Sequence, residues 1–136
     1  MVFDEQFIQG QTPSAAVGQA WDNFLASLTE TYTQVTISGS EDLTGVTCSD
    51  PVAVNQLAIA LNSNAAVSVE CNSRTWNTGS CGDSLELNSN PAGDATVCDC
   101  ANPGYVVRPT IGSEHWGSVG GDTCNGVDQT LLVEFS

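Results

Sequence analysis

The spacing of apolar residues changes along this chain, and the change constrains the possible folds more than any other feature. In residues 13–28, apolar side chains recur every three or four positions, which is the period of one helix face. Thr12 or Ser14 can cap this helix. A second segment of the same period, residues 51–62, follows a Ser-Asp-Pro sequence and ends at Asn-Ser-Asn. The sequence therefore predicts two helices, both in the N-terminal half.

Most of the other apolar residues alternate with polar ones, which is the period of a strand. This pattern predicts strands at residues 32–38, 66–71, 84–88, 96–100, 105–111 and 130–135. Two early helices followed by a run of strands are typical of an α+β fold. We expect both helices to pack on a mostly antiparallel sheet of about five to six strands. An all-β sandwich is the alternative if one helix prediction fails. A chain of 136 residues is expected to form one domain, residues 1–136.

The cysteine content predicts where such a chain works. The chain has six cysteines, an even number, in a small polar domain that contains no lysine. This combination is typical of a disulfide framework, which persists in oxidising compartments and therefore favours an extracellular or cell-surface location. The cysteines are Cys48, Cys71, Cys81, Cys98, Cys100 and Cys124.

Six cysteines allow fifteen pairings, so the connectivity is a hypothesis. A Cys71–Cys81 bridge would close a compact loop around Trp76. Cys98 and Cys100 lie two apart and would share one face of a strand, so each needs a separate partner. Cys124 would then pair with one of these two cysteines, and Cys48 with the other.

Charge excludes two classes of partner. Asp and Glu number sixteen against two cations, Arg74 and Arg108, which gives a net charge of −14. Nucleic acid is not an expected partner, because phosphates are bound by Lys and Arg. Membrane insertion is not expected either, since no apolar run approaches the roughly twenty residues of a spanning helix. Residues 1–5 lack the basic and apolar regions of a signal peptide, so export would require that Met1 is not the native start or that another route is used.

Two tryptophans suggest a glycan site. Trp76 and Trp116 lie in polar, glycine-bearing stretches, and Arg74 and Asn77 flank the first of them. An aromatic face beside amide and guanidinium groups suits a sugar ring and its hydroxyls. The alternative is that each tryptophan fills the core beneath a loop.

The single histidine raises a catalytic hypothesis. His115 and Glu86 could act as an acid–base pair, with Arg108 binding an anionic intermediate. This order of Glu, Arg and His after an N-terminal helix resembles the small secreted microbial ribonucleases, and the resemblance implies a small secreted hydrolase. The charge of −14 disagrees with an RNA substrate. The alternative is that His115 is a surface residue beside an aromatic side chain.

Carboxylates cluster in the expected turns. Glu41, Asp42, Asp122 and Asp128 could supply oxygen ligands to calcium, the one cofactor that the sequence suggests. The alternative is a solvated acidic surface.

Together these patterns favour a non-catalytic, disulfide-stabilised extracellular domain for recognition or adhesion, with a glycan or a protein surface as its partner. One alternative is a structural subunit of an extracellular filament, coat or virion that associates with itself. An unpaired sheet edge or a large exposed apolar patch would favour that alternative. The other is the hydrolase, which requires His115, Arg108 and a carboxylate to converge in one cleft.

Overall fold

The computed structural model describes residues 1–7, 14–40, 44–79, 85–88, 104–107, 117–118 and 129–136. Its helices are α1 (Ala15–Ala26) and α2 (Pro51–Ser63). Its strands are β1 (Val2–Phe7), β2 (Val35–Gly39), β3 (Val46–Cys48), β4 (Val67–Cys71), β5 (Arg74–Thr78), β6 (Leu85–Asn88), β7 (Gly104–Val107), β8 (Gly117–Ser118) and β9 (Gln129–Phe135). The predicted α+β class is confirmed, and because both helices form, the all-β alternative is wrong.

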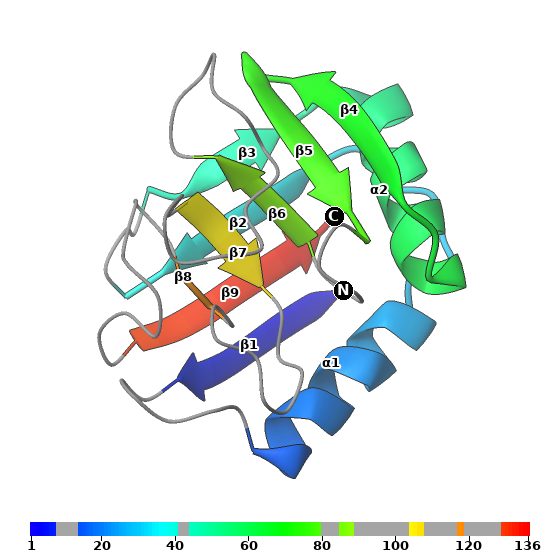
Figure 1. Cartoon of the computed structure of the whole chain (residues 1–136). Coiled ribbons are helices and arrows are strands. Elements are labelled where there is room, and N and C mark those ends of the chain that lie inside the picture. Colours follow the sequence, from blue (N-terminus) through cyan, green and yellow to red (C-terminus); the bar gives the residue numbers. More distant parts are fainter. Residues whose placement is uncertain (8–13, 41–43, 80–84, 89–103, 108–116, 119–128) are drawn as a thin grey trace.

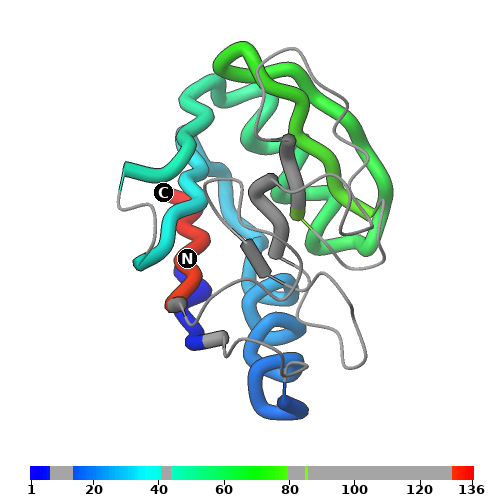
Figure 2. The backbone as a smooth tube through the Cα atoms, turned by 60° about the vertical axis from the view of Figure 1, so that its left-hand side comes forward, coloured from blue at the N-terminus to red at the C-terminus, as the bar shows by residue number. Residues whose placement is uncertain are grey.

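The described strands belong to two antiparallel sheets. One has four strands in the order β1-β9-β2-β3, and the other has five in the order β4-β5-β6-β7-β8. The five-stranded sheet lies in front of the four-stranded one, and both helices lie along one side of the pair (Figure 1). The turned view separates β1, β2 and β9 from the β4–β5 hairpin (Figure 2). The single sheet expected from the sequence is thus two sheets, an arrangement in which opposed apolar faces cover each other.

Helix α1 buries the face that its apolar period predicts. Trp21, Phe24 and Leu25 are buried, and the Ser14 hydroxyl caps the helix by accepting the Val17 N–H at 3.3 Å. The ring centroids of Trp21 and Phe24 lie 5.3 Å apart. Phe3 of β1 meets the Trp21 ring edge-on at 4.9 Å, so an aromatic cluster holds α1 against β1.

Helix α2 also begins and ends as its sequence predicts. The Asp50 side chain accepts the Val52 N–H at 3.0 Å, Pro51 occupies the first turn, and Asn64 ends the helix in the left-handed conformation. Its buried residues are Ala53, Val54, Leu57, Ala58, Ala60 and Leu61. This set contains Val54, Leu57, Ala58 and Leu61, the apolar residues that recur at helical spacing in the sequence.

Strands β1, β3, β5 and β8 were not predicted, and β8 has only two residues. β1 interrupts its apolar alternation with Asp4 and Glu5, β3 has only three residues, and β5 contains one apolar side chain, Trp76, among polar ones. Each strand is stabilised by pairing partners that are distant in sequence or by the hairpin turn, and a local period does not reveal either. The predicted strand at 96–100 lies outside the described residues.

One disulfide joins the two sheets and corrects the predicted connectivity. Cys48, at the end of β3, is bonded to Cys71, at the end of β4, with a Cα–Cα distance of 5.7 Å. The predicted Cys71–Cys81 bridge is therefore wrong, and so is the predicted pairing of Cys48 with Cys98 or Cys100, because the packing of the two sheets brings β3 and β4 together. Cys81, Cys98, Cys100 and Cys124 lie outside the described residues.

Candidate recognition surface

Trp76 is not available to a ligand. Its side chain is 0% exposed, and its indole N–H donates to the backbone carbonyl of Cys71 at 3.1 Å. Trp76 pairs with Val69 across the β4–β5 ladder and points to the same side of the sheet as Cys71, toward the core. The predicted role of Trp76 in a glycan site is therefore wrong, and its alternative role in the core is correct.

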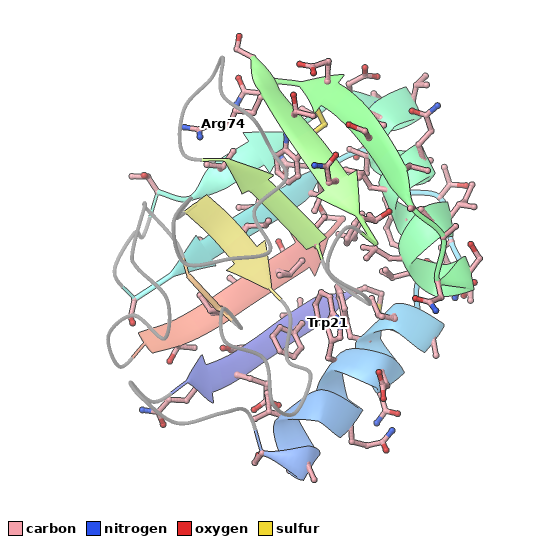
Figure 3. All side chains as sticks on the ribbon, viewed as in Figure 1. Trp21 and Arg74 are labelled. Carbon is pink, nitrogen blue, oxygen red and sulfur yellow. A yellow bond between two sulfur atoms is a disulfide. The ribbon has the colours of Figure 1, made fainter. Side chains whose placement is uncertain are left out.

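Asn77 and Arg74 do not form a sugar site with Trp76. Asn77 is buried at 7% exposure, which argues against its predicted binding role. Arg74 is half-buried at the start of β5, at the far end of the molecule from Trp21 (Figure 3). Adjacent residues on a strand point to opposite faces, so Trp76 and Asn77 cannot share one binding face.

The other predicted site residues remain predictions. Trp116, His115 and Arg108 lie outside the described residues, as do the calcium candidates Glu41, Asp42, Asp122 and Asp128. Glu86 lies in β6, where its backbone pairs with Asn77 and Val106. Within the described part of the chain, no group of three or more His, Cys, Asp or Glu residues could hold a metal ion.

A groove between α2 and β4 is the candidate site that the structure adds. It encloses about 440 Å³. Helix α2 forms one wall, β4 forms the other, and the segment that joins them closes one end. The groove is lined by Gln56, Ile59, Ala60, Ser63, Ala65, Val67, Ser68 and Val69. None of these residues carries a charge, although the chain has a net charge of −14.

The helical wall exposes apolar side chains. Val52 is 69% exposed and Ile59 is 68% exposed. They recur with Gln56 and Ser63 at positions i, i+4, i+7 and i+11, so the four share one outer face of α2. No residue of α2 is charged. This uncharged helix with two large apolar residues outside its buried stripe is the sequence signal that could have revealed the groove.

The strand wall has an open edge. β4 is the end strand of its sheet, and no described strand pairs with its outer side. β4 joins β5 through a two-residue turn in which Asn72 and Ser73 have φ of 54° and 59°, and Cys71 pairs with Arg74. The two residues that flank such a turn, here Cys71 and Arg74, form a hydrogen-bonded pair. Along the ladder, hydrogen-bonded pairs then alternate with pairs that are not hydrogen-bonded.

This alternation fixes the direction of the β4 backbone groups. The backbone groups of Val67 and Val69 point toward β5, and the N–H and C=O groups of Ser68 and Glu70 point toward the open edge. The Val67 N–H indeed points to the β5 side, where it donates to the Thr78 hydroxyl at 3.1 Å.

Local bonds hold the two walls in place. The Ala65 N–H donates to the Ala60 carbonyl at 2.8 Å, and the Thr78 hydroxyl donates to the Ala65 carbonyl at 2.9 Å. Both walls also lie within the loop of sequence separation 23 that the Cys48–Cys71 disulfide closes. The disulfide and the hydrogen bonds of Ala65 therefore hold α2 and β4 in place on either side of the groove.

A second hollow, of about 370 Å³, lies on the outer face of the four-stranded sheet. Its lining consists mostly of small polar residues with Asp4, and it includes Ser40 and Thr130. The Ser40 hydroxyl accepts the Thr130 N–H at 3.1 Å, and the Ser40 N–H donates to the Thr130 carbonyl at 3.0 Å. Unlike the groove, this hollow is lined by a carboxylate, that of Asp4 on the edge strand β1, and by no described residue of an exposed apolar helix.

Comparison of the chain with protein-family models, curated proteins and solved structures finds no significant match. Among the described helices, none has the length and apolar character needed to cross a membrane.

Proposed function

We propose that this chain is a non-catalytic, disulfide-stabilised extracellular recognition domain that binds a protein surface through the groove between α2 and β4. The observation that carries the proposal is the position of Ile59, which is 68% exposed and lines the groove beside the open edge of β4, on the same outer face of α2 as the exposed Val52. Exposed apolar residues gathered beside an unpaired edge are typical of interaction sites, and proteins otherwise protect such edges with charges or cover them.

The lining of the groove favours a polypeptide over a glycan. It contains no aromatic ring to stack on a sugar and no charged group to bind hydroxyls, while Trp76 and Asn77 are buried. Its aliphatic residues suit apolar side chains, and its β4 wall offers backbone hydrogen bonds.

The open edge of β4 also supports the second candidate, a structural subunit that assembles with its own copies. Two β4 edges could pair across a two-fold axis, as isologous interfaces do. Self-repulsion between chains of charge −14 opposes this assembly. Sedimentation across a range of salt concentrations separates the two candidates, since only the second requires an oligomer.

Selection of peptides from a random display library on the immobilised protein tests the proposal. We expect the enriched peptides to bind at least about tenfold more weakly to the Ile59→Lys variant than to the unaltered protein. The matched control is Gln19→Lys, which adds the same charge to an exposed position on α1 and should leave binding unchanged. Enriched peptides that do not distinguish the two variants, or no enrichment at all, would contradict the proposal.

A further inference from the structure

We propose that the occupant of the groove is an extended, cationic segment of a partner protein, which adds to the five-stranded sheet as a strand beside β4. This inference rests on the proposed function and specifies its partner. The backbone of β4, the side chains of the groove and the charge of the chain each support one part of it.

The backbone of β4 supports an extended segment. Ser68 and Glu70 each present one N–H and one C=O group along the open edge, at the spacing of alternate strand residues. Another strand satisfies all four groups at once, at about 4.8 Å from β4. A helical partner has its own backbone groups bonded internally and would leave the edge unpaired. Addition of a strand is therefore the binding mode that this edge fits.

The side chains of the groove define one face of the incoming strand. Val67 and Val69 lie on the face of β4 that lines the groove toward Ile59 and Ala60 of α2. Side chains of the incoming strand that lie beside these valines must point to the same side. They would cover Ile59, so we expect alternate residues of the segment to be apolar.

Charge defines the other face of the incoming strand. Glu70 is exposed, and its carboxylate accepts the Thr75 hydroxyl on the outer face of the sheet. A Lys or Arg opposite Glu70 would form a favourable cross-strand pair. The net charge of −14 would also steer a cationic segment toward the site.

The same charges disfavour a second copy as the occupant. The β4 strand of another copy would bring a second Glu70 and no cation to the interface, since neither α2 nor β4 contains Lys or Arg. Association would also bring together two chains of charge −14. The groove therefore fits a partner of opposite charge.

The test uses a synthetic peptide in which valine alternates with lysine and threonine, titrated into the whole protein and followed by amide hydrogen exchange. We expect saturable binding and slowed exchange at the amides of Ser68 and Glu70. A peptide N-methylated at the residues whose N–H groups face β4 should bind at least about tenfold more weakly. A peptide N-methylated at the intervening residues should bind as the parent does. Replacing lysine by glutamate should weaken binding at low salt.

A substitution in β4 tests the same hydrogen bonds between β4 and the peptide. Ser68→Pro removes an N–H that points to the open edge and leaves the β4–β5 bonds in place. We expect this variant to bind the peptide at least about tenfold more weakly, with Ser68→Thr as its conservative control. The N-methylated peptides keep the test decisive even if the proline variant is unstable.

The outcomes separate this inference from the proposed function. If peptides selected on the groove bind it but N-methylation has no effect and the two edge amides stay unprotected, strand addition is wrong and the recognition surface stands. Equal binding of the glutamate peptide would overturn the cationic partner. Concentration-dependent protection of the edge amides in the protein alone would show that a second copy is the occupant. If no peptide binds and the display selection also fails, the proposed function falls with the inference.

Discussion

The molecule contains two corners of the same kind, each a helix beside an edge strand, and they differ in what they expose. Helix α1 lies against β1 and helix α2 against β4, and both strands are at the edge of a sheet. The helices have 12 and 13 residues, and each is capped and buries one apolar face. The rules of helix formation and core packing are therefore satisfied equally in the two corners.

The outer faces of the corners differ. The α1–β1 corner presents Gln19 and Asn23, joined by a 3.0 Å hydrogen bond, and its strand carries Asp4 and Glu5 beside the half-exposed Val2. Charged residues on an edge strand are a common protection against unwanted pairing. The α2–β4 corner instead exposes Val52 and Ile59 beside an edge with one carboxylate, Glu70. Folding does not require this exposure, whereas the proposed binding of a partner does.

Substitution of the core tryptophans should cause the largest losses of stability, and the losses should be similar in the two corners. Trp21→Ala and Trp76→Ala each remove a fully buried side chain, so we expect each to lower the free energy of unfolding by about 3–5 kcal/mol. Urea denaturation measures this loss. A loss below about 1 kcal/mol for Trp76→Ala would contradict its burial and would reopen its role in ligand binding.

Removal of the disulfide should destabilise the α2–β4 corner more than the α1–β1 corner. Cys48→Ala combined with Cys71→Ala opens a loop of sequence separation 23, which should cost about 3 kcal/mol of stability. That loop contains α2 and β4 and excludes α1. Hydrogen exchange should accelerate more in residues 49–70 than in α1. Equal acceleration in both helices would show that the bond stabilises the whole fold rather than this corner.

The two helix caps should show a smaller and unequal effect. We expect Asp50→Ala to destabilise the protein by about 1 kcal/mol, because its carboxylate satisfies an otherwise unpaired N–H of α2. Ser14→Ala should cost less, since the hydrogen bond from Val17 to its hydroxyl is longer, at 3.3 Å, and its acceptor carries no charge. Thermal unfolding of both variants measures the difference. A larger loss for Ser14→Ala would contradict this ranking.

Local signals in the sequence predicted the parts of the fold that depend on neighbouring residues. Both helices and the strand that buries Leu131, Val133 and Phe135 follow from apolar period and capping residues, which act within one or two turns of the chain. Strand pairing and disulfide connectivity were not predicted correctly, because they depend on residues that are distant in the sequence. The pairing of β1 with β9 and the bond between Cys48 and Cys71 depend on how two sheets stack.

The candidate site was missed for the same reason. A tryptophan among polar residues gives the same sequence pattern whether it faces the core or solvent, so the sequence left both the binding role and the core role of Trp76 open. The uncharged outer face of α2 was visible in the sequence. Only the structure places it beside the open edge of β4.

The most direct test of the account is calorimetric titration of the valine–lysine–threonine peptide into three forms of the protein. These are the unaltered chain, Val52→Gln with Ile59→Gln in the α2–β4 corner, and Gln19→Ala with Asn23→Ala in the α1–β1 corner. All four positions are exposed, so the melting temperatures should be nearly unchanged. We expect the α2 variant to bind the peptide at least about tenfold more weakly and the α1 variant to bind it as the unaltered chain does. Equal affinity for all three forms, or equal losses in the two variants, would contradict it.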